Sequence, residues 1–167
     1  MGIEQLKQLL SLSWTRETCS PGLSSEWNEE NSSLGQCAIT ALIVNDFFGG
    51  KIMRCMASSG SHYYNLIEDK IFDLTVEQFL GEIPQYEDGE ERTREYLLNN
   101  EDTKNRYLLL NKNLQRTLSE KNELKQRKEN RFMSEEVSKE FRELLKLRCK
   151  QFYVDEKGRI LLKKKNN

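Results

Sequence analysis

The chain has 167 residues, of which 37% are hydrophobic and 32% are charged, which suits one folded domain with an appendage better than two full domains. The net charge of −1 conceals a division along the chain. Residues 1–111 carry 9 Lys and Arg against 18 Asp and Glu, a net charge of −9, and residues 112–167 carry 17 against 9, a net charge of +8. This asymmetry predicts an acidic domain over 1–111 and a basic helical extension over 112–167.

The composition also argues against several classes of protein. No run approaches 18 uninterrupted apolar residues, so no membrane span is expected, and the N-terminus lacks the basic and small-residue regions of a secretory signal. The four cysteines show no CxxC spacing and the chain has one histidine, which argues against a zinc site. We therefore expect free thiols in a reducing cytoplasm, with no metal, cofactor or membrane partner.

Two helices are predicted in the first third of the chain. Apolar residues within 2–13 recur at helical spacing and predict a short helix. Residues 36–48 are apolar around most of the helical circumference, which predicts a buried, central helix. Ser32 or Ser33 is expected to cap its start, and the glycine pair at 49–50 to end it.

The next segment predicts a small antiparallel sheet. Residues 51–58 alternate like a strand, and residues 60–75 predict two more strands around a turn at 68–70. Thr75 is expected to cap a short helical turn, and the acidic residues 84–95 to form a surface loop. The expected fold is α+β, with the central helix packed on this sheet.

The tail is predicted to be helical, and its partners are left open. Helix formers fill residues 93–132, with a break near 99–100, a new helix at Ser134 and a hairpin over 152–162. Basic residues alternate with nine acids, which favours an ion-paired helix surface over nucleic-acid binding. One apolar stripe could make a homo-oligomer contact or pack on the body: Val137, Phe141, Leu144, Leu145 and Cys149.

Cys37 stands at the start of the predicted central helix. A thiolate is the reactive form of cysteine, and the positive end of a helix favours it. Unpaired N–H groups in the first helical turn can also stabilise an oxyanion. Gln36 adds a side-chain donor, and Gly35 allows close approach of the backbone to a substrate. The alternative is a small buried thiol that only packs.

His62 is the single histidine and therefore the one candidate for a base beside Cys37. Asp73 on the following strand could hold the imidazole, with Asn65 as the substitute. The alternative is a histidine satisfied by neighbouring tyrosines and an aspartate that serves only the local turn. Both interpretations stay open at this point.

The register of the hairpin decides whether His62 can reach Asp73. With a two-residue turn at 69–70, Leu66 faces Asp73 and His62 lies roughly 13 Å away, which is too far. A four-residue loop places Tyr64 opposite Asp73 and makes His62 its diagonal neighbour at about 7–8 Å. A three-residue loop reverses the parity and favours a structural aspartate. A catalytic triad thus requires a longer loop or a bulge.

Over residues 12–110 the chain resembles the YunG family of small bacterial proteins. The resemblance is carried by a tryptophan, an asparagine lead-in, a Gly-Gln-Cys-Ala helix start, a Gly-Gly exit, a His-Tyr-x-Asn strand and an Asp-Leu-Thr run followed by Gln-Phe. The matching positions are Trp27, Asn31, Gly35, Gln36, Cys37, Gly49, Gly50, His62, Tyr63, Asn65, Asp73, Leu74, Thr75, Gln78 and Phe79. Ser32, Tyr64 and Lys70 depart from the family's usual proline, tryptophan and glycine.

The resemblance implies that Cys37, His62 and Asp73 belong together, although it supplies no reaction. Their order also resembles papain-like and transglutaminase-like thiol enzymes. We expect a cysteine-dependent acyl transferase or hydrolase that acts on a peptide bond, a glutamine side chain, a small amide or a thioester. The alternative is a non-catalytic binding module that binds nucleic acid or a partner through the basic tail. Candidate pocket residues are Trp27, Tyr63 and Tyr64, which could equally be aromatic core.

Overall fold

The structure of the chain is a computed structural model that describes residues 1–58, 60–148, 152–154 and 160–162. The chain forms two compact units, residues 1–119 and residues 120–167. We describe each unit by itself.

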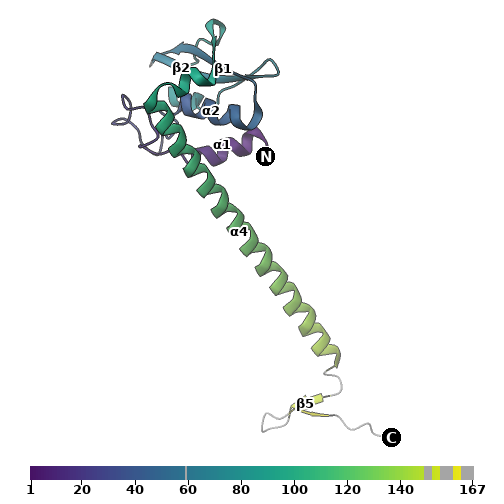
Figure 1. Cartoon of the computed structure of the whole chain (residues 1–167). Coiled ribbons are helices and arrows are strands. Elements are labelled where there is room, and N and C mark those ends of the chain that lie inside the picture. The colour runs from purple at the N-terminus through teal and green to yellow at the C-terminus, as the bar shows by residue number, and fades with distance from the viewer. Residues whose placement is uncertain (59, 149–151, 155–159, 163–167) are drawn as a thin grey trace. The chain divides into compact units, whose positions relative to one another are not determined.

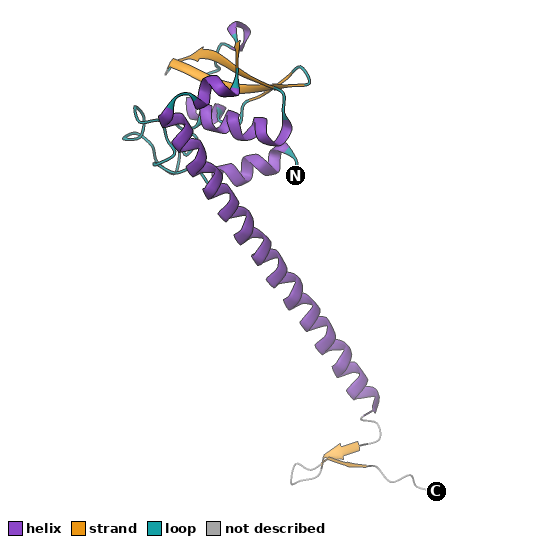
Figure 2. Ribbon diagram, viewed as in Figure 1, coloured by secondary structure: helices purple, strands orange, loops and turns teal. Residues whose placement is uncertain are grey.

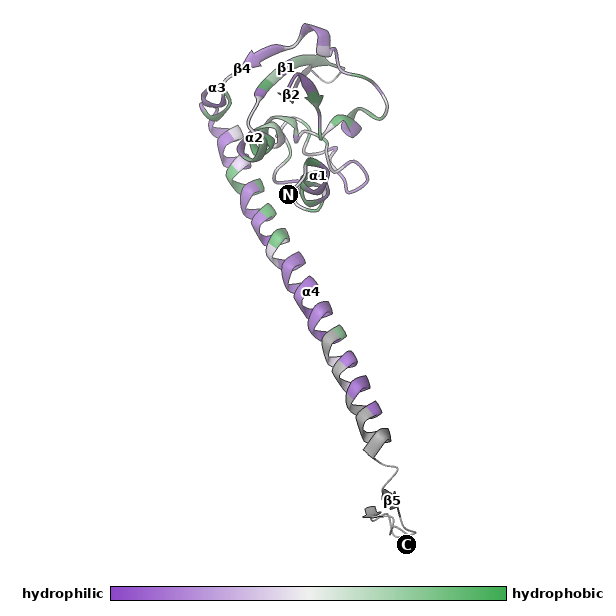
Figure 3. Ribbon diagram, turned by 90° about the vertical axis from the view of Figure 1, so that its right-hand side faces the viewer, coloured by the Kyte–Doolittle hydropathy of each residue, from purple (hydrophilic) through white to green (hydrophobic). Residues whose placement is uncertain are grey.

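Two short helices supply much of the core of the first unit. Helix α1 spans Ile3–Ser11 and α2 spans Cys37–Phe48. Figure 3 shows that α2 carries mainly hydrophobic residues, and every residue from Ile39 to Val44 is buried. The main core cluster joins these helices to Trp14 and to the first part of a long later helix: its buried members are Leu6, Leu9, Leu10, Trp14, Ile39, Ile43, Val44, Leu74, Leu110 and Leu114.

The ends of α2 confirm one prediction and correct another. Gly49 follows the helix with a φ of 67°, a left-handed conformation that glycine adopts without steric cost. The expected serine cap is wrong. The N-cap residue is Gln36, and its side chain makes no capping bond but donates to the Thr15 carbonyl at 3.0 Å. Ser33 instead belongs to the preceding turn, where its carbonyl accepts from the Gln36 N–H at 3.1 Å.

The sheet is antiparallel and small, which confirms the predicted α+β class. Its strand order is β3-β2-β1-β4, with β1 over Lys51–Ala57, β2 over Gly60–Ile67, β3 over Lys70–Phe72 and β4 over Glu90–Arg92. In Figure 2 the strands form one layer and α2 lies against it. The Asn65 side chain of β2 donates to the Ala41 carbonyl of α2 at 3.0 Å and joins the two layers.

Residues 84–95 are more ordered than the predicted surface loop. They contain a 3-10 turn, η2, over Tyr86–Asp88, then β4, and then the start of helix α3 over Arg94–Leu98. Strand β4 pairs with β1 from Ile52↔Arg92 to Arg54↔Glu90. The prediction missed β4 because its Glu-Glu-Arg sequence has no apolar alternation, and backbone pairing with β1 defines the strand.

The hairpin between β2 and β3 turns one residue earlier than the two-residue turn considered from sequence. Its two loop residues are Glu68 and Asp69, with φ values of 49° and 58°, the conformation of a type I′ turn. Ile67 pairs with Lys70 and Asn65 with Phe72, so the register continues to Tyr64 opposite Asp73. No longer loop or bulge is needed, and the expectation that a triad requires one is wrong.

The long helix α4 spans Glu101–Arg148. The break at 99–100 is confirmed by the separate helix α3, whereas the predicted break at Ser134 is wrong because α4 continues through it. Within the first unit, Leu110 and Leu114 of α4 are fully buried. Helices α3 and α4 together cover most of residues 84–148.

In the second unit, the described side chains of α4 are exposed. Ion pairs one helical turn apart join Glu123 with Arg127, Lys125 with Glu129 and Arg131 with Glu135, and such pairs each add a few tenths of a kcal/mol to a helix. The predicted hairpin strands are present as β5, Phe152–Val154, and β6, Ile160–Leu162. The turn at 156–158, Cys149 and the side chains of Val137, Phe141, Leu144 and Leu145 lie outside the described residues.

Among the described residues, no helix has the length and apolar character that crossing a bilayer would need. Within the same residues, no group of three or more His, Cys, Asp or Glu side chains is placed to bind a metal ion.

Candidate functional site

Cys37 is the first residue of α2 and its side chain is half-buried. The chain reaches this position through Gly35, which has a φ of 67°. A Cβ on Gly35 would lie 2.7 Å from the Cys19 sulfur and 2.9 Å from the Ser20 nitrogen, closer than non-bonded atoms approach. The close approach predicted for Gly35 is therefore made to the preceding loop, which it holds against the start of α2.

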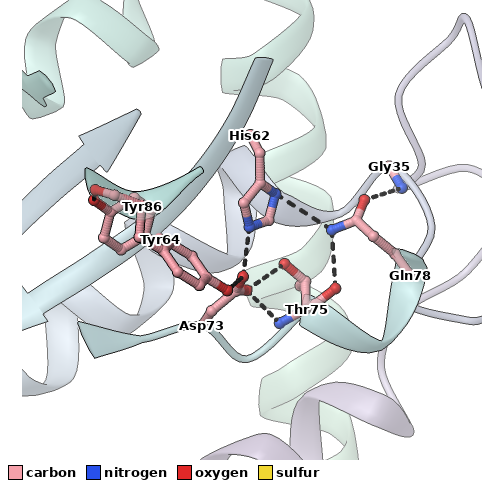
Figure 4. Close-up of polar contacts among 7 residues, drawn as sticks. All are labelled: Gly35, His62, Tyr64, Asp73, Thr75, Gln78 and Tyr86. Atoms are coloured by element: carbon pink, nitrogen blue, oxygen red, sulfur yellow. Dashed lines mark hydrogen bonds and ion pairs between the residues drawn. The ribbon is translucent and has the colours of Figure 1, made fainter. Parts of the chain in front are cut away.

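His62 and Asp73 form a buried pair (Figure 4). Imidazole Nε2 lies 2.6 Å from carboxylate Oδ2, and the two side chains are 1% and 4% exposed. The early turn of the hairpin explains this contact, because His62 is the diagonal neighbour of Asp73 across β2 and β3. The ring of Phe79 packs edge-on against the imidazole, with 4.8 Å between the ring centroids.

Four donors surround the Asp73 carboxylate. Oδ1 accepts from the Thr75 backbone N–H at 3.0 Å and the Thr75 hydroxyl at 3.1 Å, and Oδ2 accepts from the Tyr86 hydroxyl at 2.8 Å as well as from His62. Burial alone raises the pKa of Asp73, but the hydrogen bond and positive charge of His62 outweigh it, so the pKa is lowered overall. Asp73 is therefore ionised. Thr75 is the N-cap residue of the next turn, as expected, but its hydroxyl donates to Asp73 and makes no cap bond.

His62 is held in its charged form. Burial lowers the pKa of the imidazole, but Asp73, through its hydrogen bond and negative charge, and the neighbouring Cys37 together raise it to about 9. Nε2 is bonded to Asp73, and the Gln78 side chain lies 3.5 Å from the other ring nitrogen, Nδ1. The structure thus joins His62 to Asp73, with Cys37 near enough to raise the pKa of the imidazole.

Gln78 and Tyr86 belong to the site, and neither was predicted as a site residue. Gln78 lies in the 3-10 turn η1, Val76–Phe79. Its Oε1 accepts from the Gly35 N–H at 3.3 Å, and its Nε2 donates to the Thr75 carbonyl at 2.9 Å and lies 3.5 Å from His62 Nδ1. No local pattern signals the contacts with Gly35 and His62, because they join segments that are distant in sequence.

The supporting residues predicted around Cys37 have other contacts. The Gln36 side chain is fully buried, and its Nε2 donates to the Thr15 carbonyl at 3.0 Å. Its Oε1 finds no hydrogen-bond partner among the described residues. Asn65 joins the sheet to α2 through Ala41 and does not hold His62.

The three predicted pocket residues lie in different surroundings. Trp27 borders a surface cleft of about 620 Å³, together with Trp14 and Arg16. Tyr63 packs against a second, smaller core cluster, whose buried members are Ala41, Leu42, Ile52 and Leu97. Tyr64 is buried, and its hydroxyl donates to the Tyr86 carbonyl at 3.1 Å.

The two other described thiols differ from Cys37. Cys19 and Cys55 are both buried, and burial raises the pKa of each thiol to about 11. Neither thiol is therefore ionised near neutral pH.

The sequence pattern of the YunG protein family matches residues 2–119. The chain belongs to the YunG family. It is 37% identical over 100 residues to the uncharacterised protein YunG of Bacillus subtilis strain 168, a match that covers 60% of this chain and 83% of that protein. No solved structure matches the chain. The YunG family match extends over the first compact unit, which contains every residue of the site.

Proposed function

We propose that the YunG domain is a cysteine-dependent acyl transferase or hydrolase. The supporting observations are the buried His62–Asp73 contact of 2.6 Å and the position of Cys37 at the start of α2, near enough to the same imidazole to raise its pKa. An imidazolium next to a thiol at a helix N-terminus favours the thiolate. An aspartate that only capped a local turn would need Thr75 alone and would not need a buried histidine.

In the proposed reaction, the Cys37 thiolate attacks a substrate carbonyl carbon and forms a carbon–sulfur bond. The electron pair of the carbonyl moves to oxygen, where the free N–H groups of the first α2 turn can stabilise it. The His62 imidazolium then gives its Nδ1 proton to the leaving amine or thiol as the bond to it breaks.

The second half of the reaction releases the acyl group from Cys37. Neutral His62 takes a proton from water or from an acceptor amine, and the resulting nucleophile displaces the thiolate. Asp73 stays ionised throughout and holds the ring in the orientation that presents Nδ1. The substrates that fit this chemistry are a peptide bond, a glutamine side chain, a small amide and a thioester.

The proposal is tested by the pH dependence of iodoacetamide alkylation, measured at each cysteine by mass spectrometry. Cys19 and Cys55 are internal controls, because burial raises their pKa to about 11. We expect Cys37 to react much faster than both below about pH 7, and this advantage to disappear in His62→Ala. Cys37→Ser confirms the assignment of the modified peptide.

The proposed enzyme activity would be refuted if Cys37 were unreactive, or if its alkylation rate were the same with and without His62. The protein would then be a binding module in which Cys37 packs. A positive result would justify screening acyl and amide compounds with Cys37→Ser as the inactive control.

A further inference from the structure

Tyr86 reaches the Asp73 carboxylate from 13 residues further along the chain. Its hydroxyl donates at 2.8 Å to Oδ2, the same oxygen that accepts from His62 Nε2 at 2.6 Å (Figure 4). The Thr75 contacts on Oδ1 belong to an ordinary aspartate turn. The Tyr86 contact has no such local origin, and it puts two donors on one oxygen.

The segment that carries Tyr86 is held in place without that hydroxyl. The Tyr86 carbonyl accepts from the Tyr64 hydroxyl at 3.1 Å, and the two rings meet edge-on with centroids 4.9 Å apart. The backbone N–H of Gln85 donates to the Met56 carbonyl at 3.1 Å. The Tyr86 hydroxyl is therefore free to act on Asp73 rather than to anchor its own segment.

We propose that Tyr86 is a positioning residue of the His62–Asp73 pair, whose hydroxyl takes up part of the negative charge on Asp73 Oδ2 and so weakens the hold of Asp73 on the imidazole proton. A carboxylate oxygen that accepts two hydrogen bonds interacts less strongly with each donor than it would with one. Burial and the neighbouring carboxylate raise the pKa of Tyr86, so the phenol stays a neutral donor over the whole neutral range.

The role of this charge sharing in catalysis rests on the proposed function. His62 must release its proton to the leaving group and recover one later, and an imidazolium bound too tightly does so slowly. Tyr86 would thus bring the proton affinity of His62 closer to the working pH. The charge sharing itself concerns only the titration of His62 and can be measured without a substrate.

Several titratable groups from different elements surround His62. They are Asp73 after β3, Cys37 of α2, Cys55 opposite His62 on β1, Tyr64 two residues along β2, and Tyr86 of η2. Of these, Asp73 and Cys37 raise the pKa of the imidazole. Replacing Cys37 by serine therefore leaves Asp73 as the main group that raises it.

The test is the ¹H NMR titration of the imidazole in the full-length protein, in a Cys37→Ser background. The chain has one histidine, so its ring resonance needs no assignment. We expect Tyr86→Phe to raise the pKa of His62 by about 1, because the carboxylate loses a competing donor. The matched control Tyr64→Phe removes the bond to the Tyr86 backbone but leaves the Asp73 contact, so it should leave the pKa unchanged.

If Tyr86 served only to pack against Asp73, its replacement by phenylalanine would leave Asp73 in place or misplace it, and the pKa of His62 would stay unchanged or fall. Either result would overturn the inference. An equal change in Tyr64→Phe would overturn it too. Alkylation of Cys37 in the wild type keeps the two proposals apart. If Cys37 is inert but Tyr86→Phe still raises the pKa, the enzyme is refuted and the charge sharing stands.

Discussion

Replacing Asp73 by asparagine should remove most of the pH dependence that His62 gives to folding. The pKa of the imidazole is raised from 6.5 to about 9 in the folded protein, against the effect of burial, by Asp73 and Cys37. A group whose folded pKa lies above its unfolded value stabilises the fold fully below the unfolded pKa, and this stabilisation is lost as the pH rises through the folded pKa. The loss should therefore fall between pH 6.5 and about 9.

The magnitude follows from the interval between these two pKa values. One pKa unit corresponds to about 1.36 kcal/mol, so the wild type should lose roughly 3 kcal/mol of unfolding free energy over this range. Solvent screening reduces this free energy only slightly, because the imidazole is 1% exposed. In Asp73→Asn the neutral amide no longer stabilises the imidazolium, and burial opposes it.

The assay is urea unfolding between about pH 6 and pH 9, followed by tryptophan fluorescence, since Trp14 and Trp27 both lie in the first unit. Asp69→Asn is the matched control, because it makes the same chemical change at an exposed turn residue. Burial raises the pKa of Cys19 and Cys55 from 9.0 to about 11, which affects stability mainly above pH 9 and so outside this range. If the wild type and Asp73→Asn lose the same stability over this range, the reasoning is refuted.

Two further predictions concern the fold. Gly50→Ala should destabilise the protein by about 1–3 kcal/mol more than Gly49→Ala. Both residues have left-handed φ values, but only at Gly50 would an added Cβ clash, at 2.6 Å from the Leu66 carbonyl oxygen. Equal urea midpoints for the two variants would contradict this prediction. Leu114→Ala should cost about 2–5 kcal/mol, whereas Leu124→Ala should stay within about 0.5 kcal/mol, because Leu114 is fully buried and Leu124 is 57% exposed. Similar losses from both leucines would mean that the burial pattern along α4 is wrong.

Local patterns in the sequence were sufficient for the elements that carry the triad residues. The apolar run after Cys37 and the glycine pair at 49–50 predicted α2 with bounds one residue from those observed. Alternation predicted two strands with His62 on one and Asp73 on the other; His62 does lie on β2, whereas Asp73 directly follows β3. These features depend on residues close in sequence, which is why periodicity and glycine positions indicate them.

The register of the hairpin could not be predicted in this way. Glu68 and Asp69 have left-handed φ values without being glycine, so the turn carries no strong local signal. Moving this two-residue turn by one position would keep the faces of β2 but place Leu66 opposite Asp73 instead of Tyr64. His62 would then lie too far from Asp73 to bond to it, so the pair depends on a register that the turn residues do not signal.

By itself, the sequence determined the buried helix with Cys37 at its start and the strands that carry His62 and precede Asp73, because helical and strand periodicity are local properties. Only the tertiary structure decided that Gln78 reaches Gly35 and His62, and that Tyr86 shares the Asp73 carboxylate. Those contacts join segments that the chain separates by 13 to 43 residues. Such contacts follow from packing of the whole domain, which no short stretch of sequence specifies.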